Sequence, residues 1–239
     1  MHALVLAGGR GLRLAPYTRV LPKPLLPIGD RPVLAVLLER LRLGGVDHAT
    51  IALGYLGDLI QTYLGDGRRF GMSLSYLTEK EPLGTAGPIT LLATQTEPFL
   101  VVNGDILTDL PFGDLYQAHL DGGAVATVAA CTYELQLDFG CLRTEGDKLV
   151  AWEEKPTWSS LVGIGAYVLS PRVQELCPGG RVEMPALIGR LLGDGHPVAV
   201  FVTGAYWRDI GLPEVYKAVN QNPPDFVRAG GGKENALEG

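Results

Sequence analysis

MHALVLAGGRGLRLAPYTRVLPKPLLPIGDRP, residues 1–32, is the stretch that decides the fold of this chain. Its apolar run from Ala3 to Ala7 predicts a buried strand, and Gly8, Gly9 and Gly11 follow directly. Glycine allows a tight turn and lets a ligand approach the backbone amides closely. A strand that ends in such a loop is typical of a phosphate-binding site in an α/β protein.

Positive charge is concentrated in the same stretch. Residues 1–29 include no acidic residue and four basic ones, which are Arg10, Arg13, Arg19 and Lys23. The chain of 239 residues has a net charge of −6, so residues 30–239 carry −10, from 16 basic and 26 acidic residues. Four prolines, at 16, 22, 24 and 27, restrict the loop that holds these charges. The stretch is therefore suited to an anionic ligand that carries phosphate groups.

Two common phosphate-binding motifs do not match this stretch of sequence. The Walker pattern GxxxxGK[ST] is absent, and the dinucleotide pattern GxGxxG fails because Leu14 occupies its third glycine position. The stretch reads GGxGxRLxPxT followed by PKPLLP, which closely resembles the signature GGxGTRLxPxTxxxPKPLxP of the sugar-phosphate nucleotidyltransferase family. It departs from that signature at Leu12, where the family usually has Thr. The resemblance implies that Arg13 and Lys23 are catalytic.

Composition excludes several other classes of protein. A hydrophobic content of 46% is ample for a core, and no apolar run approaches the ~20 residues of a membrane span. The acidic balance argues against a nucleic-acid partner. Cys131, Cys141 and Cys177 have neither disulfide-framework nor zinc spacing. We expect a cytoplasmic enzyme that acts on small molecules and does not bind a membrane; its Leu-rich helices are compatible with a homodimer.

Strands and helices are predicted to alternate in the first half of the chain. Strands are expected at 3–7, 49–53, 72–77 and 99–102, and helices at 32–43, 56–64 and 86–94. In the second half, strands are expected at 124–131, 140–144, 148–153, 164–169 and 198–202, and helices at 172–177, 184–192 and 213–220. This order predicts an α/β fold, a Rossmann-like three-layer sandwich with a mixed, mainly parallel sheet. We expect a catalytic domain over 1–222 and a flexible tail over 223–239.

Two carboxylates are candidates for a metal site. Asp105 ends the predicted buried strand Phe99–Val102 and its Val-Val-Asn-Gly-Asp motif, so it should meet Gly8 to Lys23 at the carboxyl ends of the strands. Asp209 lies in Tyr-Trp-Arg-Asp-Ile-Gly-Leu-Pro, which resembles the family's WxDIGTP motif. The resemblance implies that both carboxylates bind Mg²⁺, an ion that prefers oxygen ligands and keeps substrate phosphates in its shell.

A second group of motifs resembles the family's sugar-phosphate pocket. Trp-Glu-Glu-Lys-Pro at 152–156 contains the family's EKP, so the resemblance implies that Lys155 binds the sugar-linked phosphate and Glu154 a sugar hydroxyl. Phe139-Gly140 and Gly163-Ile164-Gly165-Ala166-Tyr167 match two further pocket motifs, with Gly163 in place of the usual Asn. The sugar-phosphate candidates are Gly140, Glu154, Lys155, Gly165 and Tyr167.

The base-binding loop is expected in Glu79-Lys80-Glu81-Pro82-Leu83-Gly84-Thr85-Ala86-Gly87, the arrangement typical of guanylyl-transferring relatives. A carboxylate accepts both N1–H and the 2-amino group of guanine, and an unpaired buried donor costs about 1–3 kcal/mol. Glu79, or less favourably Glu81, therefore favours guanine. The nucleotide-binding candidates are Leu6, Ala7, Gly8, Gly9, Gly11, Glu79, Pro82, Gly84, Thr85, Asn103 and Gly104.

The resemblance, which is greatest to mannose-1-phosphate guanylyltransferases, implies transfer of a nucleotidyl group from GTP to mannose 1-phosphate. Three alternatives stay open from the sequence. The first is a uridylyl- or thymidylyltransferase that acts on a glucose-type 1-phosphate. The second is a non-catalytic regulatory subunit that binds nucleotide-sugars, and the third is a nicotinamide-binding dehydrogenase. The failed third glycine, and Gly54 where an acidic residue would stand, disfavour the dehydrogenase.

Overall fold

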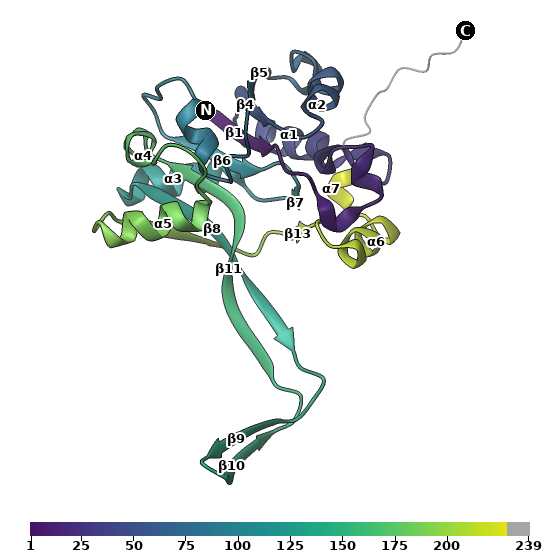
Figure 1. The fold of residues 1–239 in the computed structure, drawn as a ribbon, viewed down its shortest axis with the longest axis vertical. Helices are drawn as coiled ribbons and strands as arrows, with labels where there is room; N and C mark the ends of the chain where they lie inside the picture. Colours follow the sequence, from purple (N-terminus) through teal and green to yellow (C-terminus); the bar gives the residue numbers. More distant parts are fainter. Residues whose placement is uncertain (229–239) are drawn as a thin grey trace.

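The computed structural model describes residues 1–228 and contains a seven-stranded sheet (Figure 1). The loop after the first strand lies at the carboxyl end of that strand, which is central in the sheet. The sheet order is β12-β8-β11-β6-β1-β4-β5. Its strands are β1 (His2–Ala7), β4 (His48–Leu53), β5 (Ser73–Thr78), β6 (Phe99–Asn103), β8 (Ala126–Gln136), β11 (Thr157–Leu169) and β12 (Val198–Thr203). Strands β6, β1, β4 and β5 run parallel, β12 runs parallel to β8, and β11 is antiparallel to both β6 and β8. The predicted mixed, mainly parallel sheet is confirmed.

Helices cover both faces of the sheet. They are α1 (Val33–Leu43), α2 (Gly57–Leu64), α3 (Phe112–Gly122), α4 (Pro171–Leu176) and α5 (Met184–Gly193). Two further helices, α6 (Pro213–Gln221) and α7 (Asp225–Arg228), pack in a third cluster with residues that follow the glycine loop. Alternate residues of β1 point to opposite faces, so Val5 joins a core cluster with α1, α2 and α3, and Leu4 joins a second cluster with α4 and α5. Two cores with a shared sheet give the expected three layers. No helix among residues 1–228 is long and apolar enough to cross a membrane.

A small pair of strands outside the main sheet determines the geometry of the candidate site. Strand β7 (Ile106–Thr108) follows β6 directly, and β13 (Trp207–Asp209) pairs with it antiparallel. The register places Asp209 opposite Ile106, the neighbour of Asp105. The two predicted metal ligands are thus brought together by backbone hydrogen bonds, although 104 positions separate them in the sequence.

A long two-stranded ribbon projects from the body (Figure 1). The outer halves of β8 and β11 form its stalk, and the hairpin of β9 (Cys141–Glu145) and β10 (Lys148–Glu153) forms its tip. Residues 131–162 are called the arm below. The sequence predicted strands at 124–131, 140–144, 148–153 and 164–169 as an extension of the sheet. The inner halves of β8 and β11 belong to the sheet, whereas the arm leaves it.

Two sequence predictions are wrong in the body. The helix expected at 86–94 is a short 3₁₀ turn, Gly87–Leu91. Pro88 and two β-branched residues weaken an α-helix there, and the Thr90 hydroxyl donates to Gly87 O at 2.8 Å, which is a local alternative to helical hydrogen bonding. Helix α3 was not predicted.

The tail expected from residue 223 does not begin there. Residues 225–228 form α7, and Val227 is buried in a core cluster with Leu14, Ile28 and Ile210. Arg31 Nη1 donates to Val227 O at 3.1 Å, and the Phe226 ring packs edge-on against Tyr206. The segment covers an apolar surface of the body, and this burial stabilises it. The rest of the predicted tail, 229–239, lies outside the described residues.

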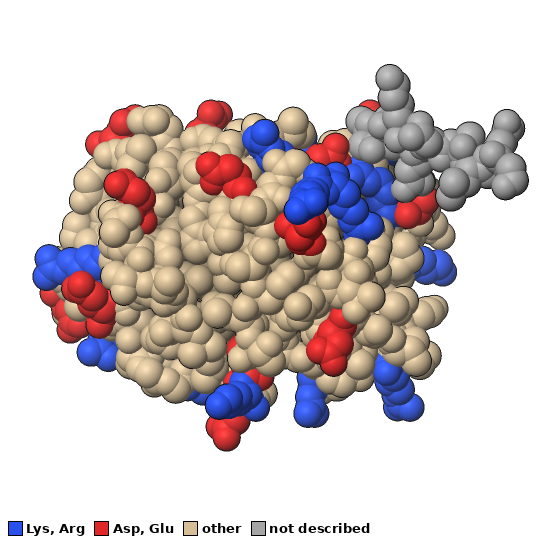
Figure 2. Space-filling model, turned by 90° about the horizontal axis from the view of Figure 1, so that it is seen from above, with Lys and Arg blue, Asp and Glu red and all other residues tan. Residues whose placement is uncertain are grey.

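Charge on the body is mixed at the end away from the arm. In Figure 2, which views that end, lysine and arginine side chains are interspersed with acidic ones, and most of the coloured surface is uncharged. Such a face lacks the continuous basic surface that a nucleic acid requires.

Candidate active site

The glycine loop, residues 8–11, leaves the carboxyl end of β1 and is held in shape by Thr18. Gly11 has a φ of 60°, a left-handed conformation that costs glycine little. A Cβ on Gly11 would lie 3.0 Å from side-chain atoms of both Thr18 and Lys23. The Thr18 hydroxyl donates to Gly11 O at 2.9 Å. The loop is thereby closed against the segment that carries Lys23.

Lys23 lies between the two predicted metal ligands. Its Nζ is 2.7 Å from Asp105 Oδ2 and 2.9 Å from Asp209 Oδ1. The Lys23 side chain is only 7% exposed, whereas those of Asp105 and Asp209 are 31% and 42% exposed. A buried ammonium requires such partners because desolvation of an unpaired charge is costly. The expected meeting of Lys23 and Asp105 is confirmed, and Asp209 joins them.

Asp209 is held in its ionised form. Burial is the largest single influence on its pKa and raises it, but the hydrogen bond and charge of Lys23, the Gly211 amide and the charge of Arg13 together leave the pKa below its usual value. Gly211 N donates to Asp209 Oδ1 at 2.8 Å, and Arg13 Nη2 lies 3.7 Å from Asp209 Oδ2. These four residues and Asp105 are called the Lys23 cluster below.

Gly211 is a member of this cluster that the sequence analysis did not single out. A Cβ at this position would lie 2.6 Å from Lys23 Nζ, 2.7 Å from Arg13 Nη2 and 2.8 Å from Asp209 Oδ1. Glycine is therefore needed for the cations and the carboxylate to meet. The signal was available, because Gly211 stands inside the quoted motif two residues after Asp209.

A cavity of about 360 Å³ opens over the glycine loop beside the cluster. Its lining residues are Leu6, Ala7, Gly9, Arg10, Gly11, Leu12, Arg13, Lys23, Pro24 and Asp105. Three of its side chains are basic and one is acidic. The Leu12 side chain, where the family usually has Thr, is 75% exposed. The cavity combines close backbone with positive charge, as binding of a polyphosphate requires.

Glu79 lies directly beside the glycine loop. A Cβ on Gly8 would lie 2.6 Å from Glu79 Oε1, so only glycine leaves room for this carboxylate. Leu83 N donates to Glu79 Oε2 at 2.9 Å and fixes its orientation. Burial raises the pKa of Glu79, and the Leu83 amide opposes this increase. The side chain is half-buried and retains free acceptor capacity, because an ionised carboxylate has about four acceptor sites.

Other residues of the base loop have structural partners. The Thr85 hydroxyl lies 3.2 Å from Glu183 Oε2 and accepts from Met184 N at 2.6 Å. Gly84 has a φ of 75°, and a Cβ there would lie 2.5 Å from Val182 O. Thr85 and Gly84 thus join the loop to the start of α5. Pro82 is exposed.

Asn103 and Gly165 connect the predicted nucleotide and sugar residues. Gly165 has a φ of 76°, and a Cβ there would lie 2.5 Å from Asn103 Nδ2. Gly104 donates its amide to Leu6 O at 2.8 Å, which joins the end of β6 to β1. Tyr167 packs against the second core cluster, and burial raises its pKa. Gly165 and Tyr167 therefore lie on the body, and Gly165 lies beside the carboxyl end of β6, next to the strand end from which the glycine loop leaves.

The other three sugar-phosphate candidates lie on the arm. Gly140 packs closely on Trp152, whose Nε1 donates to Glu154 Oε2 at 3.1 Å. Lys155 is exposed and has a φ of 46°, an uncommon conformation for a residue with a side chain. Within residues 1–228, no hydrogen bond or ion pair joins Glu154 or Lys155 to the Lys23 cluster. The structure does not bring Gly140, Glu154 and Lys155 to the nucleotide site of their own chain.

The carboxylates at this site are suited to a divalent cation that takes its other ligands from a bound phosphate or water. Asp105, in the turn between β6 and β7, and Asp209, at the end of β13, both contact Lys23 Nζ and remain partly exposed. In the part of the chain that the structure describes, no three His, Cys, Asp or Glu side chains are grouped as metal ligands. A cation at Asp105 and Asp209 would therefore need further oxygens from bound phosphate or water, which is how Mg²⁺ usually binds.

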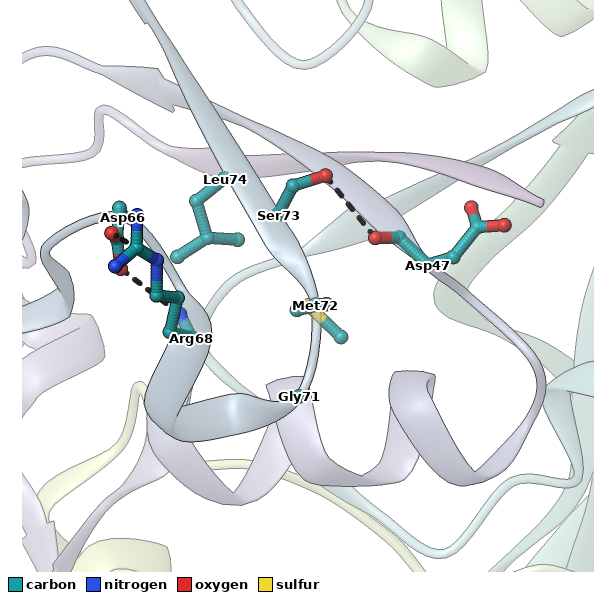
Figure 3. A pocket seen from close by; sticks show the side chains of 7 residues that line it. All are labelled: Asp47, Asp66, Arg68, Gly71, Met72, Ser73 and Leu74. Carbon is teal, nitrogen blue, oxygen red and sulfur yellow. Dashed lines mark hydrogen bonds and ion pairs between the residues drawn. The ribbon is translucent and has the colours of Figure 1, made fainter.

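A second hollow, of about 670 Å³, lies elsewhere in the body (Figure 3). It is lined by Asp47, Asp66, Arg68, Gly71, Met72, Ser73 and Leu74, and Figure 3 shows Arg68 turned toward Asp66 and Ser73 toward the backbone of Asp47. Asp47 and Ser73 stand at the amino ends of β4 and β5. Ligands of open α/β sheets bind at the carboxyl ends, so we place the candidate site at the glycine loop.

Comparison with known families gives a consistent result. The model of the family described as "Nucleotidyl transferase" matches residues 2–224. The chain is 32% identical over 249 residues to the mannose-1-phosphate guanylyltransferase catalytic subunit beta of Danio rerio, covering 97% of this chain and 69% of that protein.

Two solved structures have the same fold. One is from Bacillus anthracis, is described as a glucose-1-phosphate thymidylyltransferase and contains sucrose; it matches with a TM-score of 0.74 and 26% identity over 92% of this chain and 94% of that one. The other is HddC from Yersinia pseudotuberculosis complexed with GMP-PN, which matches with a TM-score of 0.72 and 27% identity over 92% of this chain and 98% of that one.

Proposed function

Because the chain belongs to the nucleotidyl transferase family, we propose that it transfers a guanylyl group from GTP to mannose 1-phosphate, giving a nucleotide-sugar and pyrophosphate. The observation that carries the proposal is the Lys23 cluster, in which a buried ammonium and two carboxylates lie beside a basic glycine-loop cavity. Phosphate transfer between two anionic substrates requires this combination of positive charge and metal-binding oxygens. The guanylyltransferase of Danio rerio supports the choice of substrates.

The glycine loop and Arg13 bind the triphosphate in this proposal. Residues 9–11 line the cavity, and their backbone amides would donate to phosphate oxygens that approach closely. Arg13 is 62% exposed and is held near the cluster by Asp209. Its planar guanidinium suits the β- and γ-phosphates, which leave together as pyrophosphate.

Asp105 and Asp209 would hold Mg²⁺. When bound, the ion would supply charge neutralisation at the phosphate oxygens. Lys23 keeps the two carboxylates close together despite their mutual repulsion. Its ammonium adds positive charge beside the α-phosphate, together with the metal ion and Arg13. The lowered pKa of Asp209 favours the ionised carboxylate that a metal ion needs at neutral pH.

The reaction is an in-line displacement. An oxygen of the sugar-linked phosphate attacks the α-phosphorus of GTP, and the bond from that phosphorus to the β-phosphate oxygen breaks. Pyrophosphate leaves with the bonding electron pair, and a new phosphoanhydride joins the two substrates. The nucleophile is already an oxyanion, so no general base is needed, and positioning supplies much of the rate enhancement.

Glu79 is proposed to read the base. Its carboxylate lies beside Gly8 and is oriented by the Leu83 amide, where it accepts from N1–H and the 2-amino group of guanine. Thymine and uracil offer one imide N–H between two carbonyls. A mismatch leaves a buried polar group unpaired at about 1–3 kcal/mol, which corresponds to one to two powers of ten in preference.

A thymidylyl- or uridylyltransferase acting on a glucose-type 1-phosphate is the second candidate. The observation in its favour is the likeness to the Bacillus anthracis structure. It differs from the first proposal only in the contacts of Glu79 and of the sugar pocket, and it uses the same Lys23 cluster.

Pyrophosphate release with Mg²⁺ and mannose 1-phosphate, measured in parallel with GTP, UTP, dTTP, CTP and ATP, tests the proposal. We expect a clear preference for GTP. A preference for UTP or dTTP would support the second candidate and discard the role of Glu79. No release with any of the five, or with other sugar 1-phosphates, combined with binding of nucleotide-sugars, would instead support a non-catalytic regulatory subunit.

A further inference from the structure

We propose that two copies of this chain exchange their arms, so that Glu154 and Lys155 of each copy complete the nucleotide site of the other. The inference rests on the proposed function, because it takes the arm residues as ligands of the sugar phosphate. It goes beyond that function because it assigns each active site to two chains.

The arm extends away from its own site (Figure 1). Seven successive residue pairs, from Thr157 with Gln136 to Gly163 with Ala130, join its two strands without a break. At about 3.3 Å per residue this stalk is roughly 20 Å long. It points away from the body, and the β9–β10 hairpin that precedes Glu154 and Lys155 lies at its far end (Figure 1). The site on the body therefore lacks the ligands that the arm carries.

One face of the arm is apolar and uncovered. The pairing places Tyr133 opposite Ser160 and Leu135 opposite Trp158, and residues paired in this way share a face. That face contains Cys131, Tyr133, Leu135, Trp158, Ser160 and Val162. The other face contains Thr132, Glu134, Gln136, Thr157, Ser159 and Leu161. An amphipathic two-stranded ribbon alone is at best marginally stable in water.

Exposed hydrophobic residues are concentrated on the arm to an unusual degree. Among the residues that the structure describes, 21 large hydrophobic side chains are exposed, and nine of them lie within residues 131–162. They include Phe139, Leu142 and Trp152 near the tip. A concentration of this kind marks an interaction surface.

The glycine-loop region of the body is complementary to the arm. Leu12, which lines the cavity, and Tyr17, Val20 and Leu21, which follow it in the chain, are exposed apolar side chains. Residues 1–29 carry a net charge of +4, and the arm carries −3, from six acidic and three basic residues. Opposite charge and matching apolar character favour docking of the arm on this region. In this arrangement the arm of each copy docks on the other copy of this chain, and the resulting dimer has twofold symmetry.

Complementation between two inactive variants tests the exchange. Lys23→Ala removes a body residue, and Lys155→Ala removes an arm residue. The two variants are coexpressed with different tags and purified through both tags, which selects mixed dimers. In such a dimer one site has both substitutions and the other has neither. We expect nucleotide-sugar formation at about half the wild-type rate, although each variant alone is inactive.

Three results would overturn the exchange. The first is copurified dimers with no recovered activity, which would mean that each arm closes over its own site. The second is failure of the two tags to copurify, which would mean that the chain is monomeric. The third is a Lys155→Ala variant with wild-type activity.

A second measurement does not depend on catalysis. Replacing Tyr133, Leu135 and Trp158 together with Ser should abolish copurification and halve the mass found by light scattering. Leu192→Ser, an exposed residue of α5 outside the arm, is the matched control and should leave the dimer intact. If wild-type protein forms no nucleotide-sugar but this pattern holds, the proposed function fails while the arm interface stands. If the arm variant remains dimeric, the interface is wrong.

Discussion

Lys23 Nζ lies 2.9 Å from Asp209 Oδ1, although 186 positions separate the two residues. The contact exists because β13 pairs with β7 and brings Asp209 beside the strand end that holds Asp105. Lys23 is the buried member of this pair and Asp209 the partly exposed one. The lysine is therefore a fixed element of the site, and its carboxylate partners remain open to a ligand.

Lys23→Ala should lower kcat by about two to three orders of magnitude, the usual effect of removing one preorganised group that stabilises developing charge. Two carboxylates would also lose their shared cation, so Asp105 and Asp209 should repel one another. Steady-state kinetics, with circular dichroism to verify folding, provide the measurement. Arg208→Ala, which removes an exposed arginine next to Asp209 that donates to Trp207 O and lies over the Tyr206 ring, should retain most of the activity.

Gly211→Ala should damage catalysis more than folding. The new Cβ would lie within 2.8 Å of Lys23 Nζ, Arg13 Nη2 and Asp209 Oδ1. These are the ends of long or partly exposed side chains, so they can move aside, but the cluster then loses its geometry. Activity and thermal stability should be measured together. Gly204→Ala is the control, because nothing lies within 4 Å of its Cβ position. A variant with normal kcat would contradict the role given to the cluster.

Gly165→Ala should destabilise the fold by about 1–3 kcal/mol, since it forces a side chain into a left-handed conformation. Its Cβ would also lie 2.5 Å from Asn103 Nδ2. Gly163→Ala is a control two residues away, because its Cβ would meet only Val128 Cγ1, at an ordinary 3.6 Å. Urea unfolding of the two variants gives the comparison. Equal stabilities would show that the close packing of Gly165 on Asn103 is not needed.

Glu79→Gln should reduce the preference for GTP over UTP by about one to two powers of ten, because an amide cannot accept from both donors of guanine. The ratio of kcat/KM for the two nucleotides is the measurement. Since burial raises the pKa of Glu79, the wild-type preference should also decline toward acid pH as the carboxyl becomes protonated. Glu81→Gln, an exposed neighbour, should change neither result.

His119 should make the protein less stable in acid. The ring is buried between the hydroxyls of Thr127 and Ser170, at 2.9 and 3.1 Å, and burial lowers the pKa of His119 below its ordinary value of about 6.5. The neutral form is therefore favoured in the folded state, and its stabilising contribution is present above pH 6.5 and lost as pH falls toward the folded pKa. Unfolding free energies between pH 8 and 5 should fall more steeply for wild type than for His119→Asn. Parallel profiles would assign the acid sensitivity to other groups.

Much of the body follows from local patterns in the sequence. Apolar runs such as Ala3–Ala7 and Phe99–Val102 predicted central strands because burial on both faces leaves a continuous apolar signal. The meeting of Lys23 with Asp105 followed from their positions after parallel strands. The helix expected at 86–94 does not form, because the ring of Pro88 and the hydrogen bond of the Thr90 hydroxyl outweigh the helical preference of the apolar spacing there.

Features that depend on distant contacts were not predicted. Val227 lies in a segment with the composition of a tail, and it is ordered only because it covers the cluster of Leu14 and Ile28. The need for glycine at position 211 arises from the approach of Lys23 and Arg13 from another part of the chain. The arm was read as ordinary strands, since alternation reveals a strand but not the neighbour that covers its apolar face.

The most direct test of the central claim is a label-transfer measurement with wild-type protein, Mg²⁺, mannose 1-phosphate and GTP labelled in either the α- or the γ-phosphate. The account predicts that the α-label appears in the nucleotide-sugar and the γ-label in pyrophosphate, in equal amounts, and that Lys23→Ala abolishes both. Release of the α-label as free guanosine monophosphate, or of the γ-label as inorganic phosphate, would contradict attack of the sugar phosphate at the α-phosphorus.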